Sequence, residues 1–72
     1  MDKTREMEIL IARIRQIHAA DRNALDIYAD LAQRCDEPDM KEQLRSIAQD
    51  EGRHVALDRE MLALLEPPGP GK

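Results

Sequence analysis

Residues 3–34 contain neither proline nor glycine, and this limits the fold more than any other feature of the sequence. Apolar side chains recur there at intervals of three and four, the spacing of one face of an α-helix. Pro38 then interrupts the pattern, because it lacks an N–H and suits the first turn of a new helix. The sequence therefore predicts a long helix over about 3–34, a turn at 35–37 and a second helix over about 38–65.

The residues around the second helix indicate where it begins and ends. Asp36 is the predicted N-cap, because its carboxylate can accept hydrogen bonds from the free N–H groups of the first turn. Glu37 and Asp39 add negative charge, which the helix dipole favours at this end. Residues 67–72 are rich in proline and glycine, so we expect residues 1–66 to form the helical hairpin and the tail to be disordered.

A hairpin of this size needs an additional source of stability. A single core in a chain of 72 residues rarely supplies more than about 3–5 kcal/mol. An internal disulfide is excluded, because Cys35 is the only cysteine. Tyr28 is the only aromatic residue, so the core must consist of aliphatic layers between helices, as in bundles. Metal binding or self-association remains as the expected stabiliser.

Composition also limits the expected partners and location. The net charge of -4 argues against nucleic acid and against an anionic membrane surface. No apolar run approaches the roughly 20 residues that a membrane span requires. The start of the chain does not resemble a secretory signal, so we expect a cytoplasmic protein with a reduced thiol.

Each predicted helix has an apolar seam with polar residues near its middle. On the first helix, steps of four and three give Leu10, Ile14, Ile17, Asp21, Ala24, Tyr28 and Leu31. On the second helix they give Met40, Leu44, Ile47, Glu51, His54, Asp58, Met61 and Leu65. Further apolar residues lie off these seams, namely Ile9, Ile11, Leu25, Ile27, Val55, Leu57, Leu62 and Leu64. One hairpin cannot cover them all, which favours a homodimer or a higher homo-oligomer.

Asp21, Glu51 and His54 form the candidate metal site. Asp21 lies fifteen residues before Asp36 and Glu51 fifteen after it, so an antiparallel hairpin places both about 22 Å from the turn. Glu51 and His54 share one helix face at the i, i+3 spacing. Carboxylates with imidazole suit iron, manganese or zinc. A two-fold dimer would supply four carboxylates and two imidazoles, which is the ligand set of a di-metal bundle.

The same residues also allow a plainer interpretation, in which the carboxylates form ion pairs with arginines and His54 is a satisfied histidine. The arginines nearby in sequence are Arg13, Arg22, Arg45 and Arg53. Asp58 is expected either to accept from the imidazole of His54 or to pair with an arginine. Tyr28 is expected to pack at the seam with its hydroxyl near a carboxylate or water, and His18 to be a surface or interface residue rather than an extra ligand.

The spacing of these residues resembles a known family. The stretches are Asp21-x-x-Ala24-x-x-x-Tyr28-x-x-Leu31-Ala32 and Ile47-Ala48-x-Asp50-Glu51-x-x-His54. They are similar to the rubrerythrin branch of the ferritin-like superfamily. Because the chain has only two helices, it resembles encapsulated ferritins more closely than the other members. The resemblance covers about residues 10–65.

The resemblance implies a fold, an activity and partners. The fold is an all-α, antiparallel two-helix hairpin that dimerises into a ferritin-like four-helix bundle. Asp21 takes the place of the family's first glutamate ligand, Glu51 and His54 match its Glu-x-x-His motif, and Tyr28 its tyrosine near the site. The implied activity is ferroxidase oxidation of Fe(II) at an intersubunit di-iron site. An encapsulin-type shell is an implied partner, although residues 66–72 do not resemble its docking peptide.

The alternative function is a non-enzymatic helical oligomer. In that case the polar layer fixes the register of the helices, or a bound zinc, manganese or iron ion stabilises the assembly.

Overall fold

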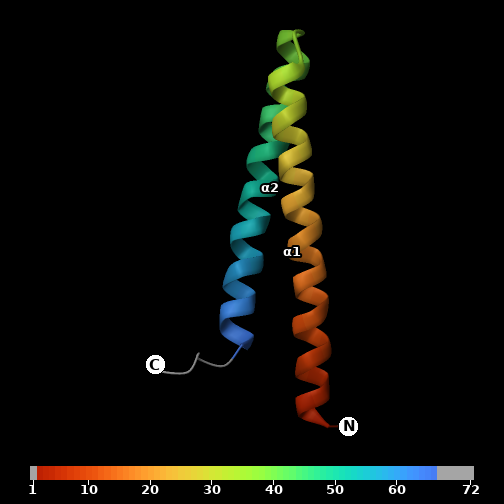
Figure 1. Cartoon of the computed structure of the whole chain (residues 1–72). Coiled ribbons are helices and arrows are strands. Elements are labelled where there is room, and N and C mark those ends of the chain that lie inside the picture. Colours follow the sequence, from red (N-terminus) through yellow and green to blue (C-terminus); the bar gives the residue numbers. More distant parts are fainter. Residues whose placement is uncertain (1, 67–72) are drawn as a thin grey trace, which may run out of the picture.

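The chain folds into a helical hairpin, described here by a computed structural model over residues 2–66. Helix α1 (Lys3–Arg34) and helix α2 (Pro38–Leu65) lie side by side, joined by a short turn, and α1 extends past the end of α2 (Figure 1). Residues 2–66 contain no strand. The all-α hairpin expected from the sequence is therefore confirmed. The predicted disordered tail at 67–72 lies outside the described residues.

The turn corrects one prediction, because the N-cap of α2 is Glu37 and not Asp36. The Glu37 carboxylate accepts from the backbone N–H groups of Asp39 (3.2 Å) and Met40 (2.6 Å). Pro38 explains the difference. It occupies the first helical position and holds the preceding residue in an extended conformation (φ -79°, ψ 120°), which is the N-cap geometry. Asp36 is one residue too early.

Contact between the two helices buries a small core. Among residues 2–66, the buried apolar side chains are Ile14, Ala32 and Val55. Val55 was predicted to lie off the seam, so the helix–helix contact is rotated from the predicted seam by a few tens of degrees. Apolar residues spaced by three and four define a broad stripe on a helix. This pattern does not determine which edge of the stripe packs against the other helix.

The rotation leaves large apolar side chains exposed along one face of the hairpin. Their exposed fractions range from 37% for Ile47 to 84% for Leu64. This apolar face comprises Ile9, Leu10, Ile17, Ile27, Leu31, Met40, Ile47, Leu57, Met61 and Leu64. At about 100° per residue, these positions lie to one side of the contact stripe on each helix. Rotation by 180° about an axis perpendicular to the plane of the hairpin exchanges its two antiparallel helices and leaves each face of the hairpin in place. Because the exposed apolar positions lie to the same side of the contact on both helices, the two apolar stripes share one face.

The opposite face of the hairpin has a different chemistry. Around a shallow groove lie Ala29, Ala32, Gln33, Lys41, Arg45, Ala48 and Gln49. We call it the polar face. Over the described part of the chain, no helix is long and apolar enough to cross a membrane.

Candidate metal centre

The structure brings Asp21 of α1 together with Glu51 and His54 of α2. One ligand atom from each of the three side chains lies within 4.8 Å of the others. The antiparallel register explains this convergence, because Asp21 and Glu51 stand equally far along the chain from the turn. Side chains separated by thirty residues in sequence therefore meet without any further partner.

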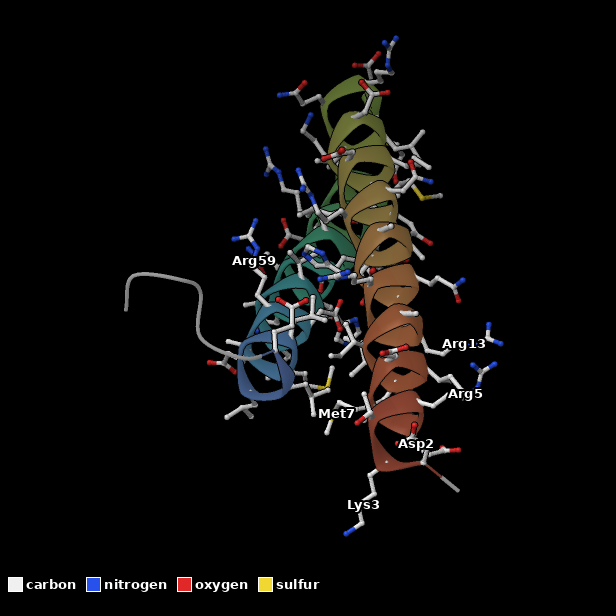
Figure 2. All side chains as sticks on the ribbon, turned by 60° about the horizontal axis from the view of Figure 1, so that its bottom comes forward. Asp2, Lys3, Arg5, Met7, Arg13 and Arg59 are labelled. Carbon is white, nitrogen blue, oxygen red and sulfur yellow. The ribbon has the colours of Figure 1, made fainter. Side chains whose placement is uncertain are left out.

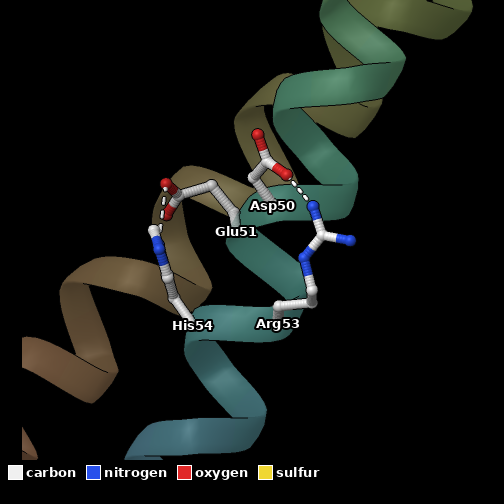
Figure 3. A network of polar contacts seen from close by, with 4 residues as sticks. All are labelled: Asp50, Glu51, Arg53 and His54. Atoms are coloured by element: carbon white, nitrogen blue, oxygen red, sulfur yellow. Dashed lines mark hydrogen bonds and ion pairs between the residues drawn. The ribbon is translucent and has the colours of Figure 1, made fainter.

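The cluster lies at the edge of the helix–helix contact and opens toward the apolar face. The Glu51 side chain is 18% exposed, whereas the His54 side chain is 55% exposed. His54 Nδ1 lies 3.5 Å from Glu51 Oε1 (Figure 3). Ile47, His54 and Met61 follow one another at intervals of seven, which keeps them within about 20° per step around the helix. His54 is thus the polar member of an exposed apolar stripe.

Arginines do not neutralise this cluster. Arg53 is ion paired with Asp50, its neighbour on the outer side of α2 (Figure 3), and Arg13 donates to Gln16. Arg5 and Arg13 point away from α2, and Arg59 lies on the outer side of α2 (Figure 2). In residues 2–66, no arginine or lysine forms an ion pair with Asp21 or Glu51. The arginine-paired interpretation is therefore wrong for these two carboxylates.

Asp58 has neither of the two partners that the sequence suggested, because no hydrogen bond or ion pair within residues 2–66 joins it to His54 or to an arginine. It is the most deeply buried charged residue described, at 4% exposure, and its Oδ2 atom has no hydrogen-bond partner among residues 2–66. Burial raises the pKa of Asp58 above its ordinary value of 3.8. The neighbouring carboxylate of Asp21 raises this pKa further, while His18 and His54 oppose the change.

The influence of Asp21 on Asp58 was missed, although the sequence carries a signal for it. Glu51 and Asp58 are seven residues apart, and therefore on one side of α2, separated by about 10.5 Å along the axis. Asp21 stands at the level of Glu51, and its negative charge raises the pKa of Asp58. Helical side chains tilt toward the N-terminus, which directs Asp21 and Asp58 toward one another in an antiparallel pair.

His18 and Tyr28 stand apart from the three-residue cluster. His18 is half-buried, and its Nε2 atom is buried without a hydrogen-bond partner within the described range. Tyr28 is half-buried, about two turns nearer the hairpin turn than Asp21. Between residues 2 and 66, no hydrogen bond joins the Tyr28 hydroxyl to a carboxylate, so its expected role near the site stays a prediction.

Comparison of the chain with protein-family models, with curated proteins and with solved structures gave no match. Fold and cluster together define a helical hairpin with a group of carboxylate and imidazole side chains that could hold a metal ion. The donor set fits such an ion, because two carboxylates and one imidazole converge without an arginine counter-charge. The ferritin-like assignment remains the expectation raised by the resemblance.

Proposed function

We propose that this chain is a ferritin-like iron-binding protein that binds Fe(II) between two copies of the hairpin and oxidises it to Fe(III). The observation that carries the proposal is the convergence of Asp21, Glu51 and His54 within 4.8 Å. Two carboxylates balance the charge of a divalent ion, and one imidazole favours iron, manganese or zinc over calcium or magnesium.

One hairpin supplies an incomplete shell, and this supports a second copy as the partner. Three side chains leave several positions of an iron ion open. The cluster opens on the apolar face, where Ile17 is 50% exposed and Met61 is 40% exposed. A two-fold partner would cover this face with the same face of its own. It would also bring a second set of Asp21, Glu51 and His54 to the centre, which makes four carboxylates and two imidazoles.

The proposed reaction uses Fe(II) as the substrate. Two Fe(II) ions each give one electron to dioxygen, which takes up two protons and leaves as hydrogen peroxide, and two Fe(III) ions result. Hydrogen peroxide can be the oxidant instead, taking two electrons and two protons to give two water molecules. Asp21 and Glu51 hold the cations and compensate their charge, whereas His54 binds through a neutral imidazole nitrogen.

The second candidate function is that of a non-enzymatic oligomer, and the small core of the hairpin is the observation that favours it. A hairpin with so few buried apolar residues needs a partner whether or not it oxidises iron. In this reading, zinc, manganese or iron in the cluster, or the polar layer itself, stabilises and aligns the assembly.

Anaerobic titration with Fe(II) followed by exposure to air separates the two functions. We expect two Fe(II) per dimer and a ferric absorbance that grows on adding air. Glu51→Gln should abolish both, whereas Asp50→Asn, its exposed neighbour, should leave both intact. Metal-dependent assembly without oxidation would support the structural alternative, and the absence of metal binding would overturn the iron proposal.

A further inference from the structure

The metal-ligand cluster lies close to the middle of the hairpin. Glu51 is the fourteenth of the 28 residues of α2, and Asp21 is the nineteenth of the 32 residues of α1. At about 1.5 Å per residue, roughly 20 Å of α2 extend from Glu51 in each direction. The cluster therefore divides the apolar face into a half beside the turn and a half beside the open end, where α1 begins and α2 ends (Figure 1).

The two halves of the apolar face carry exposed side chains at matching distances from the cluster. Distances are counted in residues along each helix, from Asp21 on α1 and from Glu51 on α2. Beside the turn, separations of 4, 6, 10 and 11 residues belong to Ile47, Ile27, Leu31 and Met40. Beside the open end, the same four separations belong to Ile17, Leu57, Met61 and Leu10. Of this face, only Ile9 and Leu64, still nearer the open end, have no counterpart.

Two copies that pair through this face and share their clusters can be arranged in two ways. If the two-fold axis runs along the helices, both turns lie at the same end, and clusters at any height would meet. If the axis crosses the helices, the turns lie at opposite ends, and the half beside the turn covers the partner's half beside the open end. Full overlap then requires a central cluster and matching halves. The hairpin has both features, and the first arrangement requires neither.

The charges at the turn favour the same arrangement. Three exposed carboxylates lie within four residues, on Asp36, Glu37 and Asp39. Of the basic residues nearby, Arg34 is ion paired with Asp30, and Lys41 donates to the backbone oxygen of Cys35 (3.4 Å). Turns at the same end would bring six carboxylates together, and like charges repel. Turns at opposite ends separate the two groups by about 45 Å, far beyond the screening length of about 8 Å at physiological salt.

We propose that the two copies pair with their turns at opposite ends, so that the two-fold axis crosses the helices at the level of the cluster. Leu10 of one copy then lies within one residue of the level of the partner's Leu31. Met40 likewise lies within one residue of the level of the partner's Met61. The inference rests on the pairing in the proposed function and adds the orientation of the partner.

Cys35 allows a direct measurement, because it is the single cysteine of the chain and lies at the turn. A nitroxide label on Cys35 reports the distance between the two turns by double electron–electron resonance, recorded with diamagnetic Zn(II) as the metal. Turns at opposite ends predict about 45 Å, twice the distance from turn to cluster. Turns at the same end predict less than about 25 Å, because helices in a bundle lie about 8–10 Å from their neighbours.

The matched control moves the label to the level of the cluster. Gln49→Cys in a Cys35→Ser background places it on the polar face, two residues from Glu51. This pair of labels should be clearly closer together than the Cys35 pair. Short distances for both pairs would overturn the orientation and keep the shared site. Long distances for both, or a monomeric mass, would instead refute the pairing on which the proposed function depends.

Discussion

The two faces of the hairpin differ in what they present to a partner. The apolar face carries a line of half-exposed Ile, Leu and Met residues with His54 in the middle, whereas the polar face surrounds a shallow groove with Lys41, Arg45, two glutamines and three alanines. In the metal-ligand cluster, the most exposed side chain is that of His54, which belongs to the first of these faces. Burial of apolar surface drives association. The face that would bury the most apolar surface against a partner is therefore also the face where the ligand shell is incomplete.

The largest expected effect comes from a charge placed on the apolar face. Ile47→Lys should dissociate the proposed dimer, because two lysines per dimer would be buried at the cost of roughly several kcal/mol. Gln49→Lys, two residues away and lining the polar face, is the control and should leave the mass unchanged. Sedimentation measures both. Dissociation by Gln49→Lys with Ile47→Lys unaffected would reverse the roles of the two faces.

Metal loading should give the next largest effect. Under anaerobic conditions, Fe(II) at a hundred times its dissociation constant should stabilise the wild type by about 2.7 kcal/mol, seen as a higher midpoint of thermal unfolding. Glu51→Gln should lose this gain, and Asp50→Asn should keep it. Equal stabilisation of all three proteins would mean that the ion binds elsewhere than in the cluster.

A smaller effect on the free energy of unfolding should come from pH, through Asp58, which is buried in the helix–helix contact between the two faces. Its pKa is raised in the folded state, so its contribution to stability is fully present below about pH 3.8 and falls as pH rises through the folded pKa. Relative to Asp58→Asn, which cannot ionise, the free energy of unfolding of metal-free wild type should therefore decrease as pH rises. Chemical denaturation at a series of pH values measures this difference. A free energy of unfolding of the wild type that rises relative to that of Asp58→Asn as pH rises would contradict the assignment.

The smallest effect tests whether the polar face stays uncovered. Gly52 follows Gln49 by three residues and Ala48 by four, on the polar side of α2, and a Cβ added there meets nothing within 4 Å. Gly52→Ala should stabilise the protein by about 0.5–1 kcal/mol, because alanine favours the helix. Urea denaturation checks this. Destabilisation would indicate that a second helix packs closely against Gly52.

Local signals predicted the helices well, because each depends on a few neighbouring residues. The absence of proline and glycine before residue 35 and the proline at 38 were sufficient to define the hairpin. The N-cap was misassigned by one residue, since the preference of aspartate for this position was weighed above the constraint that Pro38 places on Glu37. The backbone geometry imposed by Pro38 therefore outweighs the preference of aspartate for the N-cap position.

The candidate site was predictable where it depends on register and not where it depends on rotation. Equal distances from the turn were enough to bring Asp21 to Glu51 and His54. Which edge of each apolar stripe faces the other helix depends on packing of both helices together, so the burial of Val55 and the effect of Asp21 on the pKa of Asp58 were not foreseen.

A crystal structure of protein loaded anaerobically with Fe(II) tests the central claim most directly, through the anomalous scattering of iron. The account predicts iron between the apolar faces of two copies, bound by Asp21, Glu51 and His54 from both. Copies that meet through their polar faces, or a covered apolar face with no iron beside these three side chains, would contradict it.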